Sequence, residues 1–330
     1  MRAFFQRFNQ VFPVVQRLWN PHTRHAPWEH YMFRLAFATV LYLNTPSSLA
    51  VQSQPFPNGL ARFFDLGFFG EPSIYGPLYL VFSLALIPYV LGVGLPLVLP
   101  LLFFVSAGSE TLLNSQGYIR HTKQIVDMIL LGQTFVYLAK PIFGHYKSQP
   151  PGGMNWHDAA AFASRQMIAA AYVVSAYSKW RRSSGEWLAN SPLFASEIIK
   201  THDQNYYTHL EPPLGTGDSI AQWMVANYEL VAVGFGMGFL LELTALLLLL
   251  NRGTAFFYGV AIIAFHRSVE VIMGLTFPLN EQVCLIFLVN PIFWLVTGAL
   301  WLKNRNKTAT PRLPRSKTKH RAGVKGDPHQ

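Results

Sequence analysis

Hydrophobic residues gather in long runs separated by short polar stretches. A membrane-spanning helix needs about 20 mostly apolar residues. Runs that approach this length lie at about 31–44, 78–93, 95–104 and onward, 125–143, 160–177, 225–250, 255–277 and 283–302. The pattern predicts an all-α fold, a polytopic bundle of about eight transmembrane helices. The first run is marginal, and the second and third, separated by "GVGLP", could instead form one re-entrant hairpin.

Composition supports a membrane-embedded chain. Of the 330 residues, 51% are hydrophobic, 15% aromatic and only 13% charged. A soluble domain is usually about 25% charged, and a disordered chain lacks aromatic and aliphatic residues. The single cysteine, Cys284, excludes an internal disulfide.

The net charge of +10 is concentrated at the two ends of the chain. Nine Lys or Arg residues between 303 and 325 predict a disordered basic tail over 303–330, and beside a span such a tail favours anionic lipid over nucleic acid. Residues 1–24 mix Arg with Phe and Val and are expected to form an interfacial amphipathic segment. The positive-inside rule places both termini of the membrane domain, 25–302, in the cytoplasm, which requires an even number of spans.

One basic cluster breaks this rule. In "SAYSKWRRSSGEWL", Lys179, Arg181 and Arg182 fall at the outer end of the fifth run. Trp180 and Trp187 are explained equally well as ordinary interfacial aromatics. The cations need a partner, for which phospholipid phosphates, an anionic substrate and acidic side chains in the bundle are all open.

Ionisable residues in the sixth and seventh runs are functional candidates, because a charge at mid-membrane costs several kcal/mol unless it is paired or wet. Counting from the turn at 251–254 at about 1.5 Å per residue, Glu242 lies roughly 14 Å up, His266 roughly 18 Å and Glu270 roughly 24 Å. Glu242 and His266 are therefore expected to meet across two helices, lining a cavity below Lys179. The alternative is structural, with Arg267 paired to Glu242 or Glu270 to fix helix register.

Other histidines carry less information. His121 lies at the outer start of the fourth run, on the same face as Lys179, and is a second titratable candidate. His22, His25 and His30 in "HTRHAPWEH" lack the spacing of a zinc motif, so an interfacial placement is expected there and no metal site.

Two stretches resemble a known family. "AAAYVVSAYSKWRRSSGEWLANSPLF" is similar to an apolar helix followed by a lysine, a hydrophilic spacer and a Trp, and "LLELTALLLLLNRGTAFFYGVAIIAFHRSVEVIMGLTF" to a helix with an acid, an Arg turn and a helix with a central His. Both resemble the HTTM family of membrane domains, related to vitamin K-dependent gamma-carboxylase, over most of 25–302. The spacer "RRSSG" is wider than the family's, and Ser178–Lys179 replaces its paired lysines.

The resemblance implies a quinol (vitamin K-like) cofactor and carboxylase- or epoxidase-like chemistry. Lys179 would be the base that deprotonates the quinol at the outer face, with His121 assisting. Glu242, His266, Arg267, Glu270, Trp180 and Trp187 would then shape the cavity. A transporter or lipid-handling protein, and a structural partner whose charges only fix packing, are the alternatives. The expected partners are membrane lipids and a hydrophobic quinone, not nucleic acid.

Overall fold

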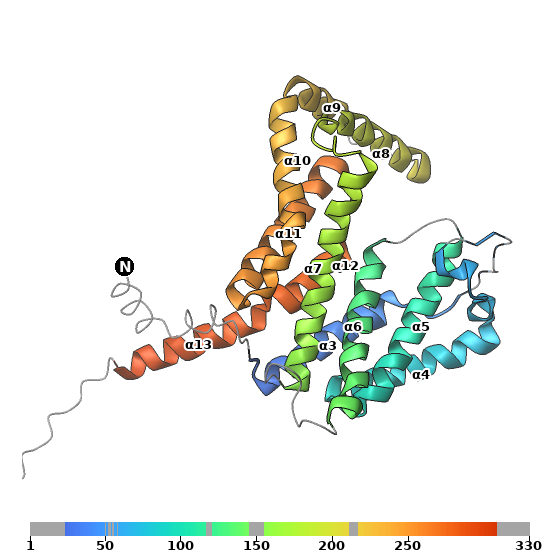
Figure 1. Cartoon of the computed structure of the whole chain (residues 1–330), viewed down its shortest axis with the longest axis vertical. Coiled ribbons are helices and arrows are strands. Elements are labelled where there is room, and N and C mark those ends of the chain that lie inside the picture. The colour runs from blue at the N-terminus through green and yellow to red at the C-terminus, as the bar shows by residue number, and fades with distance from the viewer. Residues whose placement is uncertain are drawn as a thin grey trace, which may run out of the picture. The chain divides into compact units, whose positions relative to one another are not determined.

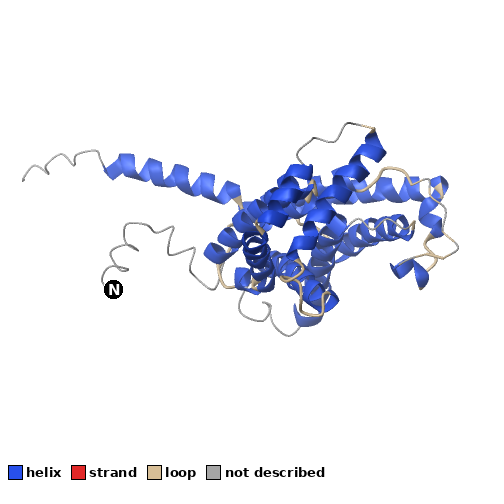
Figure 2. Cartoon of the chain, turned by 90° about the horizontal axis from the view of Figure 1, so that it is seen from above, coloured by secondary structure: helices blue, strands red, loops and turns tan. Residues whose placement is uncertain are grey.

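The computed structural model describes residues 24–49, 51, 54, 56–57, 59–116, 121–144, 155–210 and 217–308. All regular structure in these ranges is helical, with no strand (Figure 2). The predicted amphipathic segment falls outside the described residues, except for Arg24. The chain divides into two compact units, Met1–Pro291 and Ile292–Gln330. The all-α prediction is confirmed for the described part of the chain.

The last described helix corrects the predicted start of the tail. This helix, α13, covers Pro291–Thr308 and accounts for the described part of the second unit. Residues 303–308, expected to be disordered, therefore continue a helix, because the basic residues Lys303, Arg305 and Lys307 are good helix formers next to an apolar run. The rest of the predicted tail, 309–330, lies outside the described residues.

Ten longer helices make up the described part of the first unit (Figure 1). They are α3 (Pro27–Asn44), α4 (Pro72–Leu91), α5 (Leu95–Ser115), α6 (His121–Gly144), α7 (Trp156–Arg182), α8 (Phe194–His209), α9 (Gly217–Ala226), α10 (Tyr228–Leu243), α11 (Arg252–Met273) and α12 (Pro278–Cys284). Short 3₁₀ turns lie at Gly59–Arg62, Gly67–Gly70, Ser191–Leu193 and Ala245–Leu249. A π-helical turn, Leu285–Val289, follows α12.

Local sequence explains where several helices stop and start. The turn between α4 and α5 is made by Gly92 and Gly94, whose φ values of 76° and 64° lie in the left-handed region that glycine tolerates. These two helices are separate and each is long enough to cross a membrane, as the second and third predicted spans require. The Asn251 side chain accepts a hydrogen bond from the Thr254 backbone N–H at 2.9 Å and so caps α11.

Helix α7 lies at the centre of the first unit. It packs beside α6 on one side and beside α10 and the 3₁₀ turn Ala245–Leu249 on the other (Figure 1). The core of α3 to α7 contains fully buried side chains that include Phe37, Phe82, Leu99 and Ile129. Because α3, α10 and the turn Ala245–Leu249 also meet α7 from distant parts of the chain, polar residues along α7 can have partners that are distant in sequence.

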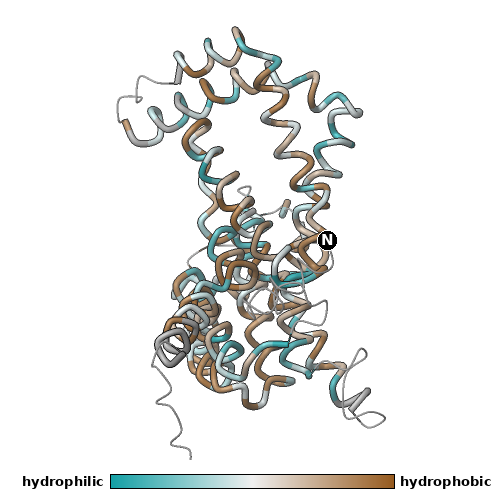
Figure 3. Tube along the Cα trace, turned by 90° about the vertical axis from the view of Figure 1, so that its left-hand side faces the viewer, coloured by the Kyte–Doolittle hydropathy of each residue, from teal (hydrophilic) through white to brown (hydrophobic). Residues whose placement is uncertain are grey.

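Apolar side chains also cover much of the outer surface. Hydrophobic residues run along most of the helices (Figure 3), and Leu84, Ile87 and Leu91 of α4 are more than half exposed. Exposed apolar helix faces are typical of a protein surrounded by lipid.

Four stretches are long and apolar enough to cross a membrane: Pro72–Leu91, Leu95–Ser115, Arg252–Met273 and Pro278–Leu300. A fifth candidate is the pair Ser219–Ala226 and Tyr228–Leu243, bent by 97°. The protein therefore has the features of a membrane protein with at least these candidate spans.

Candidate functional site

The C-terminal end of α7, which is its outer end in the predicted orientation, carries three polar side chains on one face. Tyr172, Ser175 and Lys179 are spaced by three and four residues, the spacing that aligns side chains along an α-helix. The Lys179 Nζ lies 2.5 Å from Glu242 Oε2, at the end of α10. The Ser175 hydroxyl donates to Glu242 Oε1 at 3.4 Å. Lys179 therefore points at a carboxylate from another helix and not into open solvent.

The chain returns over Lys179 immediately after α7. Gly185 has a φ of 88°, and its N–H donates to the Trp180 carbonyl at 2.9 Å, which closes the turn. This reversal brings the Trp187 ring to 5.6 Å from the Lys179 Nζ, within cation–π range. Trp180 itself is 54% exposed. Of the two tryptophans, Trp187 contacts the site and Trp180 has the exposure of an interfacial residue.

The two residues of the Lys179–Glu242 pair differ in their exposure to solvent. The Glu242 side chain is 5% exposed and that of Lys179 is 27% exposed. A buried carboxylate needs a cation or hydrogen bonds to stay charged, and Lys179 with Ser175 supplies both. The Lys179 side chain is thus partly exposed, whereas its carboxylate partner is buried.

A second polar group lies deeper along the same face of α7. The Tyr172 hydroxyl is 3.4 Å from His266 Nε2 and 3.9 Å from the Cys284 sulfur. Phe277 stacks on the His266 ring with centroids 4.8 Å apart. The Nδ1 atom of His266 is buried and has no hydrogen-bond partner among the described residues. His266 therefore lies beside the predicted site, but its described polar contact is with Tyr172 and not Glu242.

The other candidate residues named from the sequence have no described contact with the Lys179–Glu242 pair. Arg267 pairs with Glu270 at 2.7 Å and with Glu281 at 2.5 Å, while its own side chain is 60% exposed. The Arg267–Glu270 pair is therefore present, but it lies within α11, and the contact of Arg267 with another helix is made to Glu281 of α12. His121 begins α6, but its side chain lies outside the described residues.

The inner end of α7 holds a different cluster. The Asp158 Oδ1 accepts from the His25 backbone N–H at 3.0 Å and lies 2.9 Å from His25 Nδ1 and 3.1 Å from His30 Nε2. Both histidines are buried, at 7% and 6% exposure. The interfacial placement expected for them is wrong, because the first residues of α3 pack against α7 and not toward lipid headgroups.

The residue types in this cluster are those of a metal site, but a nitrogen that would have to bind the metal carries a proton. The ligand atoms of His25, His30 and Asp158 lie within 4.8 Å of one another. Arg165 Nη2 is 3.1 Å from His25 Nε2, and a guanidinium can only donate. The His25 Nε2 must then accept, so the proton of the neutral ring is on Nδ1 and is donated to Asp158. A metal needs that Nδ1 lone pair, so these residues fit a hydrogen-bonded network better than a metal centre.

The residues of this cluster come before the predicted span 160–177 in the sequence. Burial and hydrogen bonds together determine which of them are charged. Burial lowers the pKa of His25 to about 3, although the hydrogen bond to Asp158 works in the opposite direction. Burial alone would raise the pKa of the Asp158 carboxyl, but hydrogen bonds from the histidines hold that pKa below its ordinary value. At neutral pH the cluster therefore contains a neutral His25 and an ionised Asp158.

The inner cluster is extended by a buried ion pair. Glu29 lies 3.1 Å from Arg252 Nη2 and accepts from the Asn290 side chain at 2.8 Å. Arg165 also donates to the Phe287 carbonyl, in the π-helical turn, at 2.9 Å. The network ties α3, α7, α11 and the π-helical turn together at one end of the bundle.

Sequence reasoning missed a third cluster. The Lys123 side chain is fully buried, donates to the Ser106 hydroxyl at 2.8 Å and lies 3.7 Å from Asp127. Lys123 follows His121, a predicted outer-face residue, by two positions, yet its own side chain is buried. The four-residue spacing of Lys123 and Asp127 was the signal that could have predicted this pair.

No family model, curated protein or solved structure matches the chain.

Proposed function

We propose that the protein is a multi-pass membrane enzyme that deprotonates a hydrophobic quinol-type substrate at the Lys179–Glu242 pair. The proposal rests mainly on that pair, in which a partly exposed ammonium is held by a buried carboxylate. The proposal also uses the resemblance to the HTTM family. Its two motifs lie far apart in sequence, and the lysine of one meets the acid of the other.

The proposed arrangement has eight spans with both termini in the cytoplasm. Helices α6 and α7 have 24 and 27 residues, long enough to cross, yet neither is among the apolar candidates. Their polar residues account for this, because Asp127 and Arg165 are buried inside the bundle and do not face lipid. Helix α3 would be the shortest crossing, and the bent pair ending in α10 would be the sixth. Membrane lipids would surround these helices.

The proposed chemistry is a proton transfer along the ion pair. The proton that Lys179 shares with Glu242 moves to the carboxylate, which leaves a neutral amine. The amine takes the proton of the quinol O–H, and the O–H electron pair stays on oxygen as a quinolate. The resulting ammonium pairs with the quinolate while Glu242 holds the first proton, so the total charge is unchanged. A positioned base of this kind typically contributes about 10²–10⁴-fold to a rate.

The surrounding side chains would serve this step in different ways. Trp187 restrains the ammonium through its ring face. Tyr172 and His266 would hold the inner end of the substrate by hydrogen bonding, since their polar atoms are the nearest described ones deeper along the same face of α7. His121 as an assisting residue remains a prediction.

A proton or substrate path through the whole bundle is less well supported. Between Arg165 of the inner cluster and Tyr172 of the outer one, α7 presents Ile168 and Ala169, both fully buried. A transporter needs polar groups across this level, whereas an enzyme open to one face does not.

The test is oxygen-dependent oxidation of a quinol by the purified protein, together with extraction of any quinone that co-purifies. A quinolate reacts with oxygen faster than a neutral quinol, so turnover reports on deprotonation. Lys179→Ala is expected to lower turnover at least about 100-fold. The matched control is Lys200→Ala, a lysine of α8 whose side chain is 69% exposed and whose loss should leave turnover unchanged. Equal turnover in wild type and Lys179→Ala would remove Lys179 as the base.

A further inference from the structure

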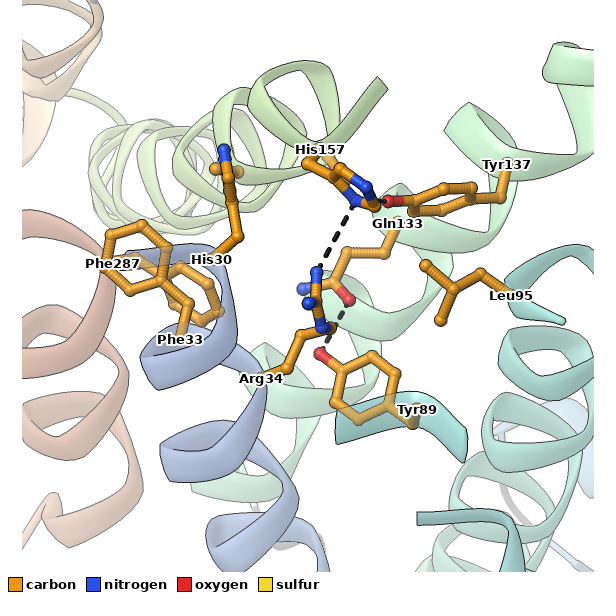
Figure 4. Close-up of a pocket in the computed structure, with 11 residues that line it drawn as sticks. His30, Phe33, Arg34, Tyr89, Leu95, Gln133, Tyr137, His157 and Phe287 are labelled. Atoms are coloured by element: carbon orange, nitrogen blue, oxygen red, sulfur yellow. Dashed lines mark hydrogen bonds between the residues drawn. The ribbon is translucent and has the colours of Figure 1, made fainter. Parts of the chain in front are cut away.

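A small cavity lies at the other end of the bundle from Lys179. It has a volume of about 30 Å³ and is bounded by α3, α6, α7 and the turn between α4 and α5 (Figure 4). A cavity needs roughly 10–15 Å³ on this measure to hold one water. The space therefore suits about two water-sized particles and is far too small for a quinol.

Among the residues that line the cavity, Arg34 is the one that is always positively charged. Its Nε donates to the Val90 carbonyl at 3.0 Å, and its Nη1 donates to His157 Nδ1 at 3.4 Å. A Cβ on Gly92 would lie 3.0 Å from the guanidinium, so the glycine leaves room for it against the turn. The guanidinium is thus held in place before any ligand arrives.

The charge of Arg34 is not balanced locally. No carboxylate among the described residues forms an ion pair with it, and no carboxylate lines the cavity. The nearest acid in the neighbourhood, Asp158, is already engaged by His25. The positive charge of Lys140 also acts on His157, in addition to that of Arg34. The local potential is therefore positive.

The Arg34 guanidinium has more N–H groups than it has acceptors among the described residues. A guanidinium has five N–H groups, and two of those on Arg34 have acceptors among the described residues. If Arg34 donates to His157 Nδ1, that nitrogen is an acceptor with one lone pair. The Tyr137 hydroxyl, at the shorter distance of 2.6 Å, takes most of it, and the Arg34 contact is the weaker one (Figure 4).

The other polar wall is also internally satisfied. The Tyr89 hydroxyl donates to the Gln133 carbonyl oxygen at 2.9 Å, and the Gln133 amide donates to the Ser164 hydroxyl at 3.0 Å. The Gln133 oxygen keeps a second lone pair, but the hydrogen bonds of Arg34 among the described residues go to Val90 and His157 and not to Gln133. What the cavity offers to a ligand is N–H groups and positive charge.

We propose that this cavity binds a small monovalent inorganic anion of halide size on the Arg34 guanidinium. Charge selects an anion, and the donor excess provides its hydrogen bonds. The small volume favours a halide over phosphate, whose four oxygens need more room than two water-sized particles. The site is independent of the proposed quinol chemistry, because none of its residues touches Lys179 or Glu242.

Thermal unfolding of the detergent-purified protein tests the proposal at constant ionic strength. Saturating chloride or bromide should raise the Tm of the wild type by roughly 3 °C over gluconate, and phosphate should behave like gluconate. Arg34→Gln should abolish the difference. Arg62→Gln, which removes an exposed arginine of the first 3₁₀ turn, should keep it.

Three results would overturn the site: equal Tm values of the wild type in chloride and gluconate, an unchanged chloride effect in Arg34→Gln, or an equal effect of phosphate. If Arg34→Gln shows no cooperative unfolding, Arg34→Lys replaces it. That variant keeps the charge but lacks the planar fork, so its apparent affinity for chloride should fall several-fold. A full wild-type affinity in Arg34→Lys would count against the guanidinium as the binding group.

Discussion

The two ends of α7 carry charges of similar chemistry in different surroundings. At the inner end, Asp158 and Arg165 are 1% and 4% exposed, and each has partners from elements distant in sequence. At the outer end, Lys179 is 27% exposed and relies on one carboxylate, that of Glu242. A charge with several fixed partners is held in one state, whereas a charge with a single partner and an open side can exchange its proton.

This difference indicates which end stabilises the fold and which is available for chemistry. The inner network joins residues that are more than 100 positions apart, such as His25 with Asp158 and Arg165 with Phe287. Its loss should therefore affect folding. The outer pair joins α7 to α10 at the proposed proton-transfer site, so its loss should affect activity, in addition to the cost of leaving the buried Glu242 without its cation.

The largest expected effect on stability comes from Arg252→Ala. This change leaves Glu29 buried with its hydrogen bonds from the Ala26 N–H and Asn290 but without its cation. Breaking one partner of a buried pair typically costs about 3–5 kcal/mol. Thermal unfolding in detergent measures the loss. The exposed pair of Lys200 and Glu197 is the control, since Lys200→Ala should cost at most about 0.5 kcal/mol. Equal losses would contradict the comparison.

Acid should weaken the inner end selectively. The pKa of His25, about 3 in the folded protein, lies below its ordinary value of 6.5. The unfolded chain therefore binds more protons between these two pH values, and stability falls as the pH drops below about 6.5. The loss from His25 alone should reach ~2 kcal/mol at pH 5.

The variant His25→Gln isolates this contribution. It should unfold more easily than the wild type at pH 7, but its stability should change less between pH 7 and pH 5. Thermal unfolding at both pH values measures the slope. A slope as steep as that of the wild type would mean that His25 does not take up a proton on unfolding.

The smallest effect is expected at Trp187. Removing its ring in Trp187→Leu takes away a cation–π contact with Lys179 worth about 1 kcal/mol. Turnover should fall roughly five-fold while the Tm changes little, because the ring restrains the ammonium and does not form the ion pair. Trp180→Leu is the matched control, since that ring is 54% exposed and should leave turnover unchanged.

The sequence predicted the helices better than their contacts. Long apolar runs placed a helix at each expected span, since run length is a local property. The pairing of His25 with Asp158 bridges 133 positions and depends on how α3 meets α7, which no local pattern encodes. The buried contact of Lys123 was missed for the same reason, because its partner Ser106 belongs to another helix, α5.

Both residues of the Lys179–Glu242 pair were predicted from the sequence, but the contact between them was not. Lys179 and Glu242 were both named, yet Glu242 was expected to meet His266. The depth estimate used the rise of an α-helix throughout, about 1.5 Å per residue. The segment Ala245–Leu249 is a 3₁₀ turn, which rises about 2.0 Å per residue. The extra rise over these five residues, about 2.5 Å, brings Glu242 nearer to the level of His266, so depth does not account for the difference. The rise gives no side-chain direction, and the Glu242 carboxylate points to Lys179 and Ser175 of α7.

The central claim is that Lys179 and Glu242 act as one proton-transferring unit, and a double-mutant cycle on quinol turnover tests it most directly. If they form a unit, Lys179→Ala, Glu242→Gln and the double variant should all be reduced to a similar low turnover, since either loss disables the same step. Losses that multiply in the double variant, or a Glu242→Gln protein as active as the wild type, would contradict the claim.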